Sequence, residues 1–198
     1  MKHRKPVLDR RKAVADILKE RRNALVVAGL GAPCWDIAAA DESPLNFYTW
    51  GGMGGAAMIG LGLALAQPRR RVLVITGDGE MLMGLGSLAT IGVQQLRNLA
   101  VIVLDNERYG ETGMQLTHTR LGVELAGVAK ASGFRAAGTI YSAAQLKTWI
   151  PRLHRQLGPV FAAIKVTAQP APMVLPVRDG ATLKTRFREA LLGAKALE

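Results

Sequence analysis

The stretch 71–110 constrains this chain more than any other, because it predicts a strand, a helix and a second strand, with polar residues at the end of each strand. The apolar run Val72–Ile75 is rich in β-branched residues and leads into the glycine-containing turn 76–79. A second apolar run, Leu99–Leu104, leads into Asp105 and Asn106. The pattern is that of a buried, parallel βαβ unit.

Asp78 and Asn106 therefore follow two strands that we expect to be neighbours. In an open parallel sheet, the carboxyl ends of neighbouring strands meet at one edge, where ligands bind. Gly77 and Gly79 flank the acid and let the backbone approach a ligand closely. A carboxylate, an amide oxygen and a turn carbonyl are hard ligands that suit Mg²⁺ when phosphates complete its shell. We therefore predict a magnesium and phosphate site at this edge.

Composition limits what surrounds this unit. The 198 residues, 49% of them hydrophobic, suffice for one substantial core, so we expect a single domain over 1–198. The only cysteine, Cys34, excludes an intramolecular disulfide and has no metal-ligand spacing, which favours a reducing, cytoplasmic setting. The longest apolar run, 56–66, is too short to span a bilayer, and we expect no secretory signal.

The net charge of +11 raises the question of nucleic-acid binding. Basic residues fall mostly in flanks and turns, at 1–12, 19–22, 69–71 and 178–188, without interleaved aromatic residues. This distribution favours a solvated basic surface, or one that meets an acidic partner subunit or an anionic substrate, over a nucleic-acid site.

The remaining chain alternates strands and helices. We predict an α/β fold, a doubly wound and mostly parallel sheet of about six strands with helices on both faces. The expected strands are 24–28, 46–50, 72–75, 99–104, 134–140 and 159–166, and the expected helices are 9–22, 35–40, 56–66, 81–96, 124–132, 142–155 and the C-terminal tail helix 182–192. The loop Gly29–Pro33 is interpreted as a turn.

Two other patterns are candidate sites. Gly52-Met53-Gly54 follows an expected strand and, with Ala57, fits a dinucleotide fingerprint, although the acidic residue that should follow about twenty positions later would have to be Asp78. A methionine before a helix is otherwise ordinarily a core residue. The polar loop 107–120 follows Asn106, and Tyr109, Gln115 and His118 are its candidate substrate contacts, His118 being also an ordinary surface histidine.

Gly77-Asp78-Gly79, followed after 26 residues by Asn106, resembles the cofactor motif of the thiamine-diphosphate-dependent 2-oxoacid decarboxylase family. The resemblance covers 24–166, the diphosphate-binding domain. It implies Mg²⁺ bound by Asp78, Asn106 and the carbonyl of Arg108, and a diphosphate facing the backbone around Gly79 and Glu80. It also implies that Met53 props the cofactor into a V shape. The implied cofactor-binding set is Gly52, Met53, Gly77, Asp78, Gly79, Glu80, Asn106, Arg108, Tyr109 and Gly110.

The family pairs this domain with a pyrimidine domain that carries an activating glutamate, and the chain has nothing similar. The resemblance therefore implies that the glutamate lies on a partner α subunit, in an α₂β₂ assembly like the two-chain sulfopyruvate and phosphonopyruvate decarboxylases. The implied reaction is decarboxylation of a small anionic 2-oxoacid, in which the cofactor supplies the electron sink. Two alternatives remain open, an NAD-binding oxidoreductase domain using Gly52-Met53-Gly54 and a non-catalytic basic binding module.

Overall fold

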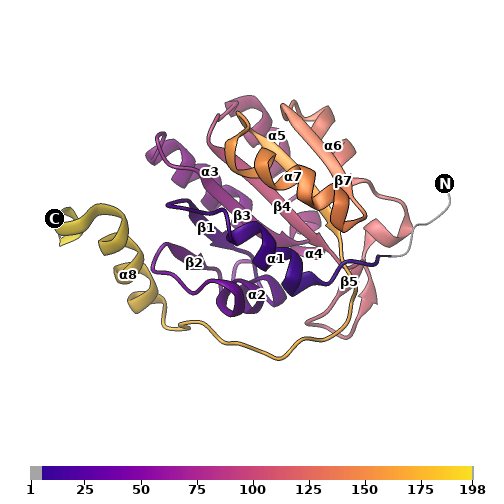
Figure 1. Cartoon of the computed structure of the whole chain (residues 1–198), viewed down its shortest axis with the longest axis horizontal. Helices are drawn as coiled ribbons and strands as arrows, with labels where there is room; N and C mark the ends of the chain where they lie inside the picture. Colours follow the sequence, from indigo (N-terminus) through magenta and orange to yellow (C-terminus); the bar gives the residue numbers. More distant parts are fainter. Residues whose placement is uncertain (1–5, 198) are drawn as a thin grey trace.

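A computed structural model describes residues 6–197 of the chain, so part of the basic N-terminal stretch 1–12 lies outside the described residues. Six parallel strands form one sheet in the order β2-β1-β3-β4-β8-β7 (Figure 1). The strands are β1 Leu25–Ala28, β2 Asn46–Tyr48, β3 Val72–Gly77, β4 Leu99–Asp105, β7 Ala136–Ile140 and β8 Val160–Lys165. The predicted fold class and all six predicted strands are confirmed, with ends that differ by one or two residues.

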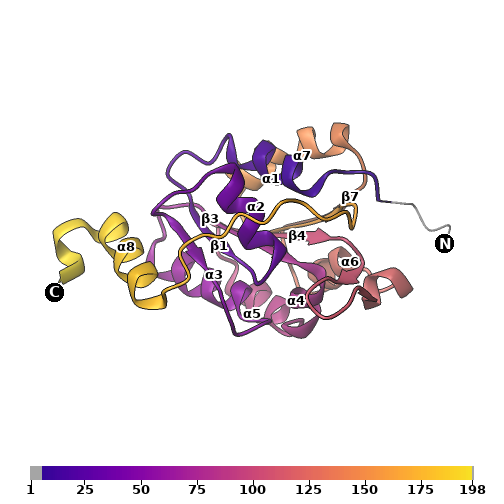
Figure 2. The same cartoon turned by 90° about the horizontal axis from the view of Figure 1, so that it is seen from below.

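Helices cover both faces of this sheet. The helices are α1 Arg10–Leu18, α2 Ala32–Ala40, α3 Ala56–Ala66, α4 Asp78–Met83, α5 Ser87–Gln94, α6 Leu125–Ala131, α7 Ala143–Arg155 and α8 Gly180–Leu192. Figure 2 shows α1, α2 and α7 on one side and α3 to α6 on the other. Among the described residues, no helix is long and apolar enough to cross a membrane.

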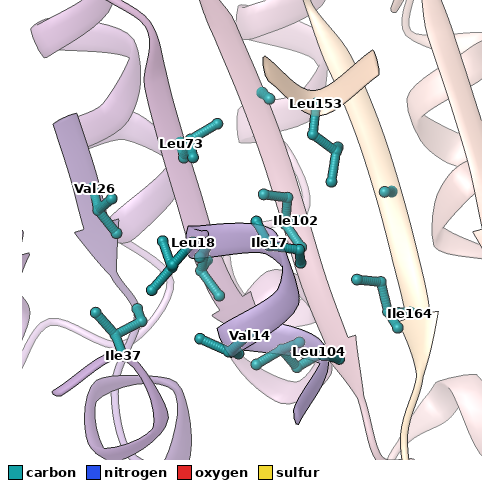
Figure 3. Close-up of a cluster of buried hydrophobic side chains, with 14 of the residues drawn as sticks. Val14, Ile17, Leu18, Val26, Ile37, Leu73, Ile102, Leu104, Leu153 and Ile164 are labelled. Carbon is teal, nitrogen blue, oxygen red and sulfur yellow. The ribbon is translucent and has the colours of Figure 1, made fainter. Parts of the chain in front are cut away.

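The strand sequences explain the two layers, because successive side chains point to opposite faces. Val26, Leu73 and Ile102 pack with α1 side chains such as Ile17, as Figure 3 shows. Their sequence neighbours, such as Val74, face the second cluster under α3, α5 and α6. Both faces are apolar, which is why the strands read as continuous hydrophobic runs.

The strand order places a topological switch point between β1 and β3. From β1 the chain moves outward to β2, and it then returns to the other side of β1 to form β3 and β4. Crossovers that leave in opposite directions open a crevice above the carboxyl ends of these strands. Gly77 of β3 pairs with Leu104 of β4, so the residues that follow each strand emerge at the same height.

The helix predicted at 81–96 is wrong in its bounds. It begins at Asp78, so the acid lies in the first turn of α4, and the chain breaks at Gly84 before α5 starts at Ser87. A Cβ on Gly84 would collide with the carbonyl oxygen of Gly54. The break therefore lets the glycine loop before α3 pack directly against α4.

Two terminal helices also differ from prediction. The helix predicted at 9–22 ends at Leu18, and Arg21 turns inward to bond Asp41 and Asn46 at 2.9 and 2.6 Å. The tail helix α8 starts two residues earlier than predicted because Asp179 caps its amino end, accepting a hydrogen bond from the backbone N–H of Thr182.

A segment of thirteen residues, 167–179, joins β8 to α8 and crosses the α2 side of the molecule (Figure 1). The carbonyl of Pro172 accepts a hydrogen bond from Arg11, and the carbonyl of Val177 accepts one from the indole of Trp50. Beyond it, Phe187 of α8 meets Phe47 of β2 edge to face, with ring centroids 5.5 Å apart. The tail helix thus packs on its own chain.

Two glycines of α3 provide a matched test of how tightly the helix packs on the sheet. A Cβ at Gly60 would collide with Cγ2 of Val74 on β3, whereas a Cβ at Gly62 would meet nothing within 4 Å. We expect Gly60→Ala to lower the free energy of unfolding by about 1–3 kcal/mol through overpacking. We expect Gly62→Ala to raise it by about 0.5–1 kcal/mol, because alanine favours the helix. Urea denaturation measures both, and shifts of the same sign would contradict this packing.

Candidate functional site

A cavity of about 500 Å³ lies above the carboxyl ends of β1, β3 and β4. It brings together most of the residues that the sequence motif singled out. The predicted residues that line it are Met53, Asp78, Gly79, Glu80, Asn106, Arg108, Tyr109 and Gly110. Gly52 and Gly77 do not line it; Gly77 caps the start of α4, and Gly52 supplies a positive φ of 66° in the loop before α3.

The Asp78 carboxylate is almost completely buried, with 2% of the residue exposed. Its Oδ2 accepts hydrogen bonds from the hydroxyls of Thr117 at 2.6 Å and Thr119 at 3.3 Å. Burial and the nearby carboxylate of Asp105 raise the pKa of Asp78 to about 7, despite those two bonds. A cation at this position would favour the ionised form.

Asp105, the last residue of β4, is a second buried carboxylate and was not predicted as a site residue. It lies 2.8 Å from the ammonium of Lys165 and accepts a 2.8 Å bond from the hydroxyl of Thr119. Lys165 also bonds Glu107 at 2.9 Å. Burial disfavours the charged lysine, but the two carboxylates outweigh it and raise the pKa of Lys165. Asp105 therefore has its own cation, whereas Asp78 forms no ion pair with any of the described residues.

Asn106 and Arg108 lie together on the cavity wall, as predicted. The side-chain oxygen of Asn106 accepts a 2.9 Å hydrogen bond from the backbone N–H of Arg108, which forms a tight turn. Between them, Glu107 has a positive φ of 62°. Asn106 and Arg108 thus share the cavity wall with Asp78.

Glu80 was predicted to offer its backbone to a diphosphate, but its side chain has a structural task. One carboxylate oxygen accepts 2.7 Å bonds from the backbone N–H of Leu30 and the hydroxyl of Thr76, and the other accepts a 3.3 Å bond from Ala56 N–H. A Cβ on Gly29 would collide with this carboxylate. Glu80 thereby joins β1, β3 and the start of α3 beneath the cavity.

Tyr109 and Met53 both approach Gly79. A Cβ at Gly79 would lie 2.7 Å from the Tyr109 ring and 3.6 Å from the Met53 methyl carbon. Met53 is 36% exposed, so it is not the core residue that a lone methionine before a helix would ordinarily be. Gly79 is required at this position because any side chain there would displace the tyrosine.

The other candidates in the loop 107–120 lie outside the cavity. The loop forms an unpredicted hairpin, β5 Arg108–Tyr109 with β6 Gln115–Leu116, followed by the short helix η1 His118–Leu121. Gln115 bonds within the hairpin to Thr112. His118 is exposed and its Nδ1 is 3.4 Å from the hydroxyl of Tyr109. Among the described residues, the link of His118 to the cavity is its contact with Tyr109.

Sequence reasoning missed one wall of the cavity. The loop Gly29–Pro33, interpreted as a turn, contributes Leu30, Ala32 and Pro33. The sequence feature that could have indicated this wall is Gly31, a glycine that has a φ of 77° and lies close to Glu111. The dinucleotide interpretation of Gly52-Met53-Gly54 is disfavoured, because this loop follows the edge strand β2 and the crevice lies over β1, β3 and β4.

The donor set fits a divalent cation held jointly with a phosphate group. No cluster of three or more His, Cys, Asp or Glu ligands occurs among residues 6–197. A cation beside Asp78 and Asn106 would therefore take further oxygens from its ligand, which is how Mg²⁺ is bound with phosphates. The buried carboxylate, the amide oxygen and the glycine at position 79 suit such a group.

Comparison with known proteins identifies the family. The family model described as thiamine pyrophosphate enzyme, C-terminal TPP binding domain, matches residues 31–164. The solved structure of benzoylformate decarboxylase from Polynucleobacter necessarius superposes with a TM-score of 0.67 at 20% identity, covering 87% of this chain and 36% of that one. This likeness shows the fold.

Curated relatives match more strongly in sequence. The chain is 37% identical over 188 residues to sulfopyruvate decarboxylase subunit beta of Methanothermobacter thermautotrophicus, covering 95% of this chain and 98% of that protein. It is 45% identical over 115 residues to phosphonopyruvate decarboxylase of Streptomyces viridochromogenes, covering 58% of this chain and 28% of the relative. This chain therefore belongs to the thiamine pyrophosphate enzymes and carries their C-terminal cofactor-binding domain.

Proposed function

We propose that the chain is the Mg²⁺- and thiamine-diphosphate-binding subunit of a two-chain 2-oxoacid decarboxylase acting on substrates such as sulfopyruvate or phosphonopyruvate. The observation that carries this proposal is the convergence of Asp78 and Asn106 on one cavity inside the matched family segment. The substrate class is supported by the names of the two relatives. The near-equal length of the first relative supports a β-type subunit, and we propose one domain over residues 1–198.

In this proposal, Asp78, the side chain of Asn106 and the carbonyl of Arg108 hold Mg²⁺, and the diphosphate lies against Gly79 and the start of α4. Bound thiamine diphosphate supplies the electron sink for loss of CO₂. The hydroxyls of Thr117 and Thr119 fix the orientation of the Asp78 carboxylate through the bonds to its Oδ2. Oriented ligands need no rearrangement when the cation binds.

Met53 and Tyr109 act on cofactor conformation and solvent access in this scheme. Both side chains lie over Gly79 at the cavity wall, where they exclude water and restrict where a bound ring system can rest. Met53 would support the bent cofactor. His118 is 3.4 Å from the Tyr109 hydroxyl and has no assigned catalytic role.

We propose that a pyrimidine-domain α subunit completes the site and supplies the activating glutamate, in an α₂β₂ assembly. Met53 and Met114 line the cavity and are 36% and 43% exposed, so a partner seated there would bury apolar surface. The net charge of +11 suits an acidic partner. No nucleic acid takes part in this scheme.

Removing the metal ligands tests the assignment. We expect Asp78→Ala to weaken Mg²⁺-dependent binding of thiamine diphosphate by roughly 100-fold or more, because an anionic ligand is lost. Asn106→Ala should lose about tenfold, because the lost ligand is neutral. The control Asp16→Ala removes the same charge from the exposed face of α1 and should change nothing. Calorimetric titration measures all three, and wild-type affinity in both site variants would refute the assignment.

The raised pKa of Asp78 predicts a pH-dependent stability without metal. Between pH 4 and 7 the folded chain holds a proton on Asp78 that the unfolded chain has already released. Stability should therefore fall as the pH rises through this window, by at most about 1.4 kcal/mol per pH unit. Asp78→Asn should remove this component. Urea denaturation in EDTA at pH 5, 6, 7 and 8 measures it, and identical pH profiles for wild type and variant would contradict it.

Activity should depend on the partner. We expect the purified chain to bind the cofactor weakly and to decarboxylate neither sulfopyruvate nor phosphonopyruvate, because half of the cofactor site is missing. Co-expression with the pyrimidine-domain subunit should restore turnover, with that subunit alone as the control. CO₂ release measures the reaction, and efficient decarboxylation by the isolated chain would overturn the two-chain proposal.

A further inference from the structure

One wall of the cavity lies outside the thiamine motif and has no part in the scheme above. It is built by the start of α1, the start of α2 and the segment that follows β8. It is lined by Arg10, Pro33, Trp35, Gln169 and Pro170. They come from stretches far apart in sequence, which meet because α1 packs against α2 and because the segment after β8 passes both (Figure 2).

Arg10 on this wall belongs to a cluster with an uneven charge balance. The Asp36 carboxylate is fully buried and is bonded by two arginines, by Arg10 through Nε and by Arg11 through Nε at 3.1 Å. The side chains of Arg10 and Arg11 are 10% and 24% exposed. Two guanidinium groups share one carboxylate, so the cluster keeps one net positive charge.

The two arginines differ in what their remaining donors meet. Arg11 uses Nη2 to bond the carbonyl of Pro172 at 2.6 Å. Within residues 6–197, the hydrogen bonds of Arg10 all go to Asp36, through Nε and through Nη2 at 3.5 Å. Its Nη1 has no hydrogen-bond partner among these residues, and the side chain lines the cavity. Arg10 is therefore the arginine of this cluster whose charge borders the cavity, in addition to Arg108 of β5.

Trp35 adds a second donor on the same wall. Its indole N–H is buried and has no hydrogen-bond partner among the described residues. Buried donors without partners cost free energy, and native proteins seldom leave them so unless a ligand or water completes them. The incompletely neutralised guanidinium of Arg10 favours an anionic acceptor, and the unpartnered indole N–H of Trp35, a residue of the same cavity wall, can donate to such a group.

We propose that Arg10 is an oxyanion-binding residue of this cavity, which takes a phosphate, phosphonate or sulfonate group on its guanidinium, with Trp35 as an additional donor. Asp36 holds the guanidinium in place, and its other partner, Arg11, keeps that carboxylate neutralised. The ligand class rests on the proposed function, which offers two sources of this chemistry. One source is the diphosphate of the cofactor, and the other is the anionic head group of the 2-oxoacid.

The test compares Arg10→Gln and Arg10→Lys with the matched control Arg11→Gln. Arg10→Gln leaves Asp36 paired with Arg11, so no buried charge loses its only partner and the fold is expected to survive. Arg10→Lys keeps the charge and loses the planar fork. Arg11→Gln removes the same charge from the same carboxylate, at a residue that does not line the cavity.

Two binding arms distinguish the sources, each run on the purified chain and on its complex with the partner subunit. The first titrates thiamine diphosphate in Mg²⁺. The second titrates sulfoacetate and phosphonoacetate, with acetate as the uncharged-head control, into cofactor-loaded protein. Both arms measure binding, so a failure to decarboxylate would count against the proposed function and would leave the test of Arg10 intact.

We expect Arg10→Gln to lose roughly 10- to 100-fold in affinity in one arm, as for a lost charge-assisted hydrogen bond. A loss of affinity in the first arm identifies the cofactor diphosphate as the group that Arg10 binds. A loss of affinity in the second arm identifies the anionic head group of the substrate. Arg11→Gln should lose less than about threefold, because its charge is more exposed and better screened. The inference is overturned if a folded Arg10→Gln protein keeps its affinity in both arms, or if Arg11→Gln loses as much. Should Arg10→Gln not fold, unchanged affinities of Arg10→Lys in both arms overturn it.

Discussion

The site depends on two buried carboxylates, Asp78 and Asp105, at the ends of neighbouring strands. Their mutual electrostatic repulsion has to be offset by nearby groups. The register of β3 with β4 fixes their separation along the sheet. Lys165 neutralises Asp105, and the hydroxyl of Thr119 lies within hydrogen-bond distance of both acids, 2.8 Å from Asp105 and 3.3 Å from Asp78. Among the described residues, Asp78 forms no ion pair, and its Oδ2 accepts from hydroxyl groups.

The second constraint is the attachment of the loops to the sheet. Glu80 bonds the turn after β1 and the start of α3 with one carboxylate, so the cavity floor is a hydrogen-bonded unit. The close contact of Gly84 with Gly54 ties the same loop to α4. Rigid floors of this kind hold ligands in a fixed geometry, whereas residues 110–116 of the hairpin beside the cavity are exposed.

The sequence by itself determined the sheet and the centre of the site. Apolar runs ending in polar residues predicted six strands, because a parallel strand buried on both faces must be apolar along its whole length. The spacing of Asp78 and Asn106 was sufficient to predict that they share one edge, since a βαβ crossover returns the chain to the neighbouring strand end. Local pattern and one crossover rule were enough for these features.

Only the tertiary structure decided which side chains complete the site. Glu80 reaches Leu30, Lys165 reaches Glu107, and Thr117 reaches Asp78, across 50, 58 and 39 positions of sequence. No periodicity encodes such contacts, because they depend on how separate loops pack above the sheet. The break at Gly84 likewise depends on a distant segment, because Gly84 packs against the backbone of Gly54. Arg10 could not be singled out either, because in sequence it is one of several charges on an amphipathic helix. The sequence was sufficient to predict where the strands end, whereas packing between distant segments determined which side chains contact the residues at those ends.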